Sequence, residues 1–298
     1  MSLVDPTIAI LITGALVGMT GALLGSFLVL RGNSMLADAI SHSILFGIAV
    51  AWLLTGQTSG PVQIIGAALS GVLAVFLIEL LTRTRRLRDD AAIGLVFPAL
   101  FSAGVVLINV YARDVHLDEH TVLLGEIGFV WLDTLTVMGV EIPRAMLTLS
   151  VMLLVDALFV LAFFKTLKLA TFDADLARVL GLMPGLIFYA HLSLLSGTAV
   201  AAFDAVGVVL FISFVVVPPA AAYLVTQRLV SLIALAMLIA AASAPIGYWM
   251  AVWLDVSIGG MMALSTGGFL LLAYCWRRLR DHRHYRSRSL EPPPASSA

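Results

Sequence analysis

Charged side chains are scarce in this sequence of 298 residues. Aspartate, glutamate, lysine and arginine make up only 12% of it, and hydrophobic residues make up 61%. An ordinary soluble domain is roughly one quarter charged. The mean hydropathy of +1.05 points the same way. A water-soluble core could not hide this much apolar surface, so the composition excludes a soluble globular protein and indicates a membrane protein.

Cysteine and the common catalytic motifs are also missing. The one cysteine, Cys275, cannot form an internal disulfide and leaves the redox compartment open. The two lysines, Lys165 and Lys168, lack the Gly-x4-Gly-Lys-Ser/Thr setting that holds nucleotide phosphates, and no His-Glu-x-x-His pattern occurs. We therefore expect a protein that is not an enzyme and that takes its energy from a partner or from an ion gradient.

Long apolar runs are what the sequence does contain. A window of about 20 residues predicts nine membrane spans, at about residues 7–30, 34–55, 61–81, 91–111, 145–164, 185–202, 204–225, 229–252 and 258–276. The first run lacks the positive region of a signal peptide and is long enough to span. Its small residues Gly14, Gly18, Gly21 and Gly25 predict a face that packs closely on another helix. Residues 123–140, interrupted by Glu126 and Asp133, predict a short interfacial or re-entrant helix.

The basic residues predict the orientation. With the N-terminus outside and the C-terminus in the cytoplasm, only Arg113 and Arg144 of the 17 lysines and arginines lie outside. The predicted fold is therefore an all-α, polytopic membrane helix bundle of about nine transmembrane helices. Residues 1–281 form its transmembrane domain. The proline-rich end, residues 282–298, is predicted to be a disordered cytoplasmic tail.

An aspartate and a histidine interrupt the second apolar run. Asp38 and His42 belong to the sequence DAISH, and their spacing of four puts both on one helix face. Charge is costly in hydrocarbon, so such a pair is by default a functional-site candidate. A carboxylate beside an imidazole suits manganese, iron or zinc. The alternative is a buried pair that only fixes the helix register.

The longest inner loop predicts a short amphipathic helix within residues 171–184. Asp173 or Asp175 can cap it, Gly181 can end it, and an apolar edge lies between them, made of Leu176, Val179 and Leu180. Such a helix can dock in a groove of another protein or lie on the lipid surface. Its spacing does not decide between these two.

Other polar residues have a structural and a functional interpretation. Glu79 is predicted to reach the arginine-rich loop that follows it. The remaining candidates are either solvated or hydrogen-bonded groups or further members of a metal path: His116, His120, Glu126, Asp156 and His191.

Four segments together resemble a known family. RGNSMLADAISHSILFGIAV at 31–50, AAIGLVFPALFSAGVVLIN at 91–109, TFDADLARVLG at 171–181 and FDAVGVVLFISFVVVPPAAAYLVT at 203–226 are similar to the metal-transporting ABC permeases. These are the membrane subunits of bacterial manganese, zinc and iron uptake systems. The resemblance extends from about residue 10 to 275, in order.

The resemblance implies roles for individual residues. Asp38 and His42 would coordinate the metal, with Ser41 a neighbour and Asp204 a third ligand. The coupling residues, which would sit in a cleft of an ATPase subunit, are Asp173, Asp175, Ala177 and Gly181. Pro218 and Pro219 would break a helix inside the bundle. Phe46 stands where the family often has proline, which leaves the bend of that helix open.

These observations together predict the permease subunit of an ABC importer in the bacterial cytoplasmic (inner) membrane. Its transported ion is expected to be Mn²⁺, with Fe²⁺ or Zn²⁺ as alternatives, and no cofactor is bound permanently. Expected partners are a cytoplasmic ATPase subunit that binds ATP, an extracytoplasmic metal-binding protein, a second permease copy and the lipid bilayer, but no nucleic acid. The competing prediction is a proton-coupled secondary transporter with a proton relay made of Asp38, His42, His191 and Asp204.

Overall fold

The computed structural model describes residues 5–56, 61–111, 127–137 and 140–288. This part of the chain contains nine helical segments long and apolar enough to cross a membrane. They lie in α1 (Pro6–Leu30), α2 (Met35–Thr55), α3 (Pro61–Arg83), α4 (Asp89–Tyr111), α6 (Arg144–Ala162), α9 (Pro184–Val225), which holds two of them, α10 (Leu229–Leu254) and α11 (Ile258–Arg288). The predicted all-α bundle with nine spans is confirmed.

The segment before α6 differs from the prediction. Instead of an interfacial or re-entrant helix, its described residues form a 3-10 turn, η1 (Ile127–Phe129), and an antiparallel hairpin of β1 (Thr134–Val137) and β2 (Val140–Pro143). The reason is local, because five of the eight strand residues are Thr, Val or Ile, which favour extended backbone. Residues 123–126 lie outside the described residues.

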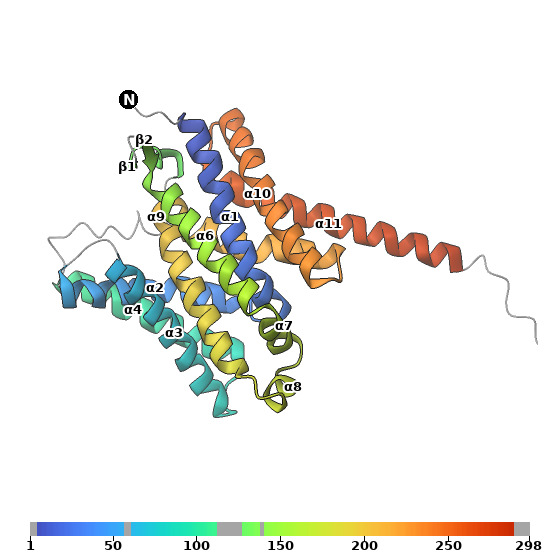
Figure 1. The fold of residues 1–298 in the computed structure, drawn as a ribbon, viewed down its shortest axis with the longest axis horizontal. Helices are drawn as coiled ribbons and strands as arrows, with labels where there is room; N and C mark the ends of the chain where they lie inside the picture. The colour runs from blue at the N-terminus through green and yellow to red at the C-terminus, as the bar shows by residue number, and fades with distance from the viewer. Residues whose placement is uncertain (1–4, 57–60, 112–126, 138–139, 289–298) are drawn as a thin grey trace, which may run out of the picture.

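The helices form two groups that share α9 (Figure 1). In one group, α2 packs against both α3 and α4. In the other, α1 packs against α6, α9 and α10, and α11 packs on α9 and α10. The centre of the core contains fully buried Phe27 of α1 and Phe211 and Phe214 of α9. The group of α2 to α4 contacts the rest of the chain chiefly through α9.

The glycine face of α1 packs closely, as predicted. A Cβ atom on Gly18 would come within 3.1 Å of Ala240 in α10. A Cβ atom on Gly25 would overlap the backbone carbonyl of Val215 in α9. The absence of side chains at these positions therefore lets α1 approach the backbones of two neighbouring helices.

Helix α9 contains a break near the start of its second span, Ala205–Val225. Gly207 has φ 74° and ψ 169°, a conformation that L-residues with a side chain rarely adopt. The break falls close to the predicted boundary between residues 202 and 204. Pro218 and Pro219, which were expected to break a helix, lie within the second half of α9, where the backbone stays helical. Glycine, not proline, therefore interrupts this helix.

Two short helices follow α6 at one end of the molecule, and α11 is longer than predicted. The short helices are α7 (Phe164–Phe172) and α8 (Ala174–Val179). Helix α11 continues to Arg288, so residues 282–288 of the predicted tail are helical. Three of these seven residues are arginine, which favours helix. Residues 289–298 lie outside the described part of the chain.

Candidate functional site

Helix α2 brings the Asp38 and His42 side chains together. Nε2 of His42 lies 3.4 Å from Oδ1 of Asp38, and the two side chains are 29% and 38% exposed, respectively. Their neighbours Ala37, Ile40 and Ser41 are buried against the rest of the chain. The pair therefore lies on a face of α2 that this chain covers only in part.

Two aromatic rings of α4 hold the imidazole of His42. Phe97 stacks on it with ring centres 5.5 Å apart and planes 29° apart, and Phe101 meets it edge to face at 5.9 Å. Gly104, one turn further along α4, lies directly against the α2 backbone, because a Cβ there would be 2.8 Å from the nitrogen of Phe46. Helix α2 is continuous from Met35 to Thr55. Phe46, at the position where the family often has proline, therefore lies within an unbroken helix.

Asp38 and His42 are two predicted metal ligands, and the structure adds no third carboxylate, imidazole or thiol side chain beside them among the described residues. Among the described side chains, no group of three or more His, Cys, Asp or Glu residues gathers at one place. Ser41 donates its hydroxyl hydrogen to the carbonyl of Ala37 (2.8 Å) inside its own helix. Asp204 lies in α9 three residues before the break at Gly207, and its side chain is outside the described atoms. If this pair holds a metal ion, its other ligands come from outside the described His, Cys, Asp and Glu side chains.

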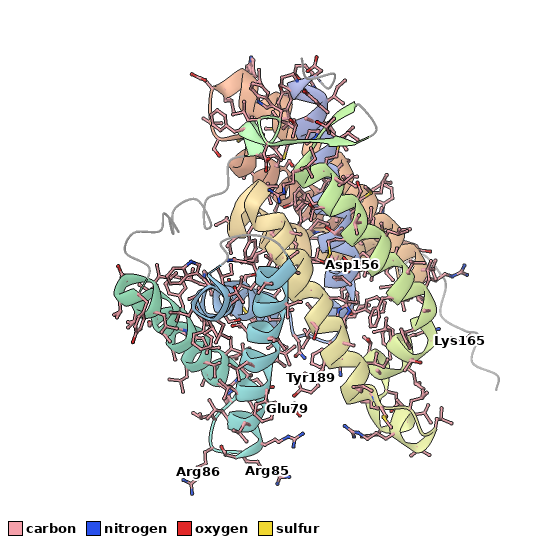
Figure 2. The ribbon with its side chains drawn as sticks, turned by 60° about the vertical axis from the view of Figure 1, so that its left-hand side comes forward. Glu79, Arg85, Arg86, Asp156, Lys165 and Tyr189 are labelled. Atoms are coloured by element: carbon pink, nitrogen blue, oxygen red, sulfur yellow. The ribbon has the colours of Figure 1, made fainter. Side chains whose placement is uncertain are left out.

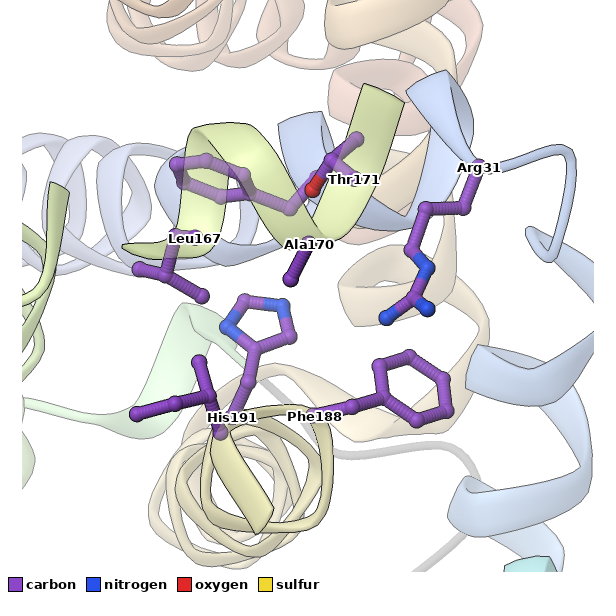
Figure 3. Close-up of a pocket in the computed structure, with 8 residues that line it drawn as sticks. Arg31, Leu167, Ala170, Thr171, Phe188 and His191 are labelled. Atoms are coloured by element: carbon purple, nitrogen blue, oxygen red, sulfur yellow. The ribbon is translucent and has the colours of Figure 1, made fainter. Parts of the chain in front are cut away.

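His191 of α9 packs against α1 and α7. Its Nε2 is 3.1 Å from the carbonyl oxygen of Leu24, and its ring meets Phe27 edge to face. Figure 3 shows the ring between α7, which carries Leu167 and Ala170, and the α1 side of the bundle, around a cavity of about 10 Å³. That volume holds about one water molecule. These contacts favour the structural interpretation of His191.

Arg31 and Phe188 form a second contact beside this cavity. The guanidinium carbon of Arg31 lies 4.0 Å from the centre of the Phe188 ring, a cation-π contact between the end of α1 and the start of α9 (Figure 3). Partial burial lowers the pKa of Arg31 below its usual range. The first two turns of α9 are thus tied to α1 by two contacts.

Asp156 is the one fully buried carboxylate of the described bundle. It lies on α6 (Figure 2), and its Oδ2 accepts a hydrogen bond from the hydroxyl of Thr198 on α9 (2.8 Å). The contact joins two helices that also pack on each other. Asp156 therefore has the hydrogen-bond partner that its structural interpretation requires.

Glu79 links α3 to α9. Its carboxylate accepts a hydrogen bond from Tyr189 of α9 and forms an ion pair of 2.7 Å with Arg83. Figure 2 shows Glu79 and Tyr189 next to each other, close to the end of the molecule that carries Arg85 and Arg86. The predicted contact of Glu79 with the arginine-rich segment is confirmed by its ion pair with Arg83. Its hydrogen bond with Tyr189 could not be predicted from the sequence.

The short helix α8 has the caps that its sequence predicts. Oδ1 of Asp173 accepts a hydrogen bond from the backbone N–H of Leu176 (2.9 Å), and Gly181 ends the turn with φ 75°. Asp175 pairs with Arg178, and Ala177 is fully buried. The predicted apolar edge is exposed, with Val179 83% accessible. Helix α8 therefore presents uncovered apolar side chains.

Helix α8 and the turn after α3 lie at the same end of the molecule (Figure 1). Residues 5–277 of this chain match the ABC 3 transport family. The chain belongs to that family. The match reaches into every span and includes the segment that contains α8, so the family resemblance drawn from the four sequence segments is confirmed.

Relatives of this ABC 3 family protein include transporters named for different metals. It is 48% identical to the manganese transport system membrane protein MntD of Bacillus subtilis, over 87% of this chain and 88% of the relative. It is 42% identical to the zinc transport system membrane protein TroD of Treponema pallidum, over 90% and 73%. The solved structure of PsaBC from Streptococcus pneumoniae in complex with Fab matches with a TM-score of 0.74, 28% identity and coverage of 89% and 90%.

The family establishes the class of protein but not the role of each residue. Asp38, His42, Asp204 and the segment 171–184 remain predicted sites. Sequence reasoning missed the aromatic clamp on His42, although Phe97 and Phe101 are four residues apart and so share a helix face. Their spacing was visible, but which helix they face depends on the tertiary packing.

Proposed function

We propose that this ABC 3 family protein is the membrane permease subunit of an importer for divalent transition-metal ions, with manganese as the transported ion. The observation that carries the proposal is the Asp38–His42 pair, 3.4 Å apart and partly exposed in a helix of low polarity. A carboxylate with an imidazole suits such ions. The similarity to a manganese transport protein supports the preference for manganese, and iron and zinc accept the same ligand types.

The incomplete ligand set supports a path shared by two permease chains. A transition metal takes four or more ligands, and the described residues offer two at this place. Because both side chains remain partly exposed on α2, a second copy or a close paralogue facing this surface would complete the set and close the path. Asp204 is the third ligand that we propose from this chain.

Helix α8 supports coupling to a separate ATPase. Its exposed apolar edge, Leu176, Val179 and Leu180, has no cover from the described chain, and its caps hold it in a fixed shape. Docked in a groove of an ATPase subunit in the cytoplasm, it would transmit closure of that subunit to the bundle. A metal-binding protein would deliver the ion at the opposite side of the membrane.

The proton-coupled alternative receives no support from the described geometry. Of its four relay residues, His191 is hydrogen-bonded to the carbonyl of Leu24 and packed on Phe27, while Asp38 and His42 face the partly exposed side of α2. Uptake that survives a proton uncoupler and stops when the ATPase is inactivated would separate the two mechanisms.

Uptake of ⁵⁴Mn by vesicles holding the reconstituted complex tests the proposal. Asp38→Ala and His42→Ala should each abolish uptake, because each removes a ligand, while the chain still inserts and binds its ATPase. Asp90→Ala, which removes an exposed carboxylate at the start of α4, is the matched control and should transport normally. Normal manganese uptake by Asp38→Ala would show that the site is wrong.

A further inference from the structure

A basic cavity lies between the end of α9, the residues that follow it and the end of the span in α11. Its volume is about 390 Å³, and its lining includes Tyr223, Thr226, Gln227, Trp276, Arg277 and Arg280. The α9 residues close the second half of that helix, and the α11 residues end the span Ile258–Arg280. The cavity therefore opens at the level where hydrocarbon gives way to water.

The described side chains give this cavity a positive charge. Arg277 and Arg280 are three residues apart on α11, so their guanidinium groups point to the same side. Neither has a carboxylate partner among the side chains that the structure describes. A guanidinium binds a phosphate through two parallel hydrogen bonds, and two of them favour an anion with several oxygens. Thr226 and Gln227 add a hydroxyl and an amide as further donors.

The surroundings of the cavity match a lipid better than a soluble anion. Tyr223 and Trp276 are both more than half exposed at this level, as in the aromatic belts of membrane proteins. Leu272 lies four residues before Trp276 on the same face of α11 and is 67% exposed, so an acyl chain has an apolar surface to follow. Basic pockets between transmembrane helices are a known setting for anionic headgroups.

We propose that this cavity binds the headgroup of an anionic glycerophospholipid, with the phosphodiester between Arg277 and Arg280 and the acyl chains along α11. The proposal does not depend on the identity of the transported ion. A bound headgroup would hold α11 against the loop between α9 and α10, because residues of α11 and of that loop line the cavity.

The test uses the full-length chain, purified in detergent and stripped of lipid. Dioleoyl phosphatidylglycerol should raise the thermal unfolding midpoint and stay bound in native mass spectrometry, whereas phosphatidylcholine and inorganic phosphate should do neither. Each of Arg277→Gln and Arg280→Gln should weaken phosphatidylglycerol binding about fivefold, and the double variant about 25-fold. Stabilisation by inorganic phosphate alone would overturn the lipid assignment.

A charge-matched control separates the cavity from general surface charge. Arg278→Gln with Arg86→Gln removes two positive charges, but neither residue lines the cavity. This variant should keep phosphatidylglycerol binding. If the Arg277→Gln and Arg280→Gln double variant folds poorly, Arg277→Lys with Arg280→Lys replaces it and should keep part of the binding. Equal loss in the control pair would contradict the site. Loss of ATPase binding in R277Q/R280Q with phosphatidylglycerol binding unchanged would show a protein contact instead.

Discussion

At the scale of single residues, local spacing in the sequence predicted the Asp38–His42 pair, whereas the aromatic rings beside His42 depend on tertiary packing. A spacing of four placed Asp38 and His42 on one face before any fold was known, and the structure brings them within 3.4 Å. The rings of Phe97 and Phe101 belong to another helix. Aromatic residues are common in apolar spans, so a sequence does not mark which of them will contact a particular histidine.

The aromatic clamp predicts an effect on metal affinity. Phe97→Leu removes the ring stacked on His42 but keeps an apolar side chain, so the fold should persist while the imidazole loses its fixed orientation. We expect the manganese concentration for half-maximal uptake to rise on the order of tenfold, as for the loss of other groups that orient a ligand. Phe76→Leu, a change at a half-exposed position of α3, is the control. An unchanged half-saturating concentration in Phe97→Leu would mean that the ring has no orienting role.

At the scale of elements, hydropathy located the nine spans well and the irregular segments poorly. Each span needs about 20 apolar residues, a signal that tertiary contacts cannot remove. The hairpin of β1 and β2 has only four residues in each strand, and its apolar residues also fit a short helix. The break in α9 follows from one glycine backbone angle. Prolines were the stronger sequence signal, but the backbone stays helical at Pro218 and Pro219.

The close contact of α1 with α9 predicts that Gly25 does not tolerate a side chain. Gly25→Ala would push a methyl group into the carbonyl of Val215, so we expect a loss of stability of about 1–3 kcal/mol, or more if the two helices cannot separate. Gly94→Ala is the matched control, because no atom lies within 4 Å of a Cβ there. Fluorescence-detected size exclusion after heating measures both. Equal unfolding midpoints for the two variants would contradict the close packing of α1.

At the scale of the whole molecule, the partial exposure of Asp38 and His42 predicts a second chain that faces them. Met35 lies three residues before Asp38 on the same face of α2 and is 56% exposed. In a Cys275→Ser background, Met35→Cys should be cross-linked to the facing permease chain by a short bifunctional thiol reagent. Leu69→Cys, an exposed position on α3, should remain uncross-linked. A complex that transports metal but gives no product from Met35→Cys would place the pair away from a chain interface.

Helix α9 connects α8 to the rest of the bundle through two segments that meet at Gly207. Helix α8 ends at Val179, and α9 begins at Pro184, so a push on α8 enters α9 at its first residue. Within about two turns, that helix is fastened to α3 through Tyr189 and to α1 through His191. A push on α8 would therefore meet these two contacts first, and the break at Gly207 would let the second half of α9, which ends at the basic cavity, turn separately from the first.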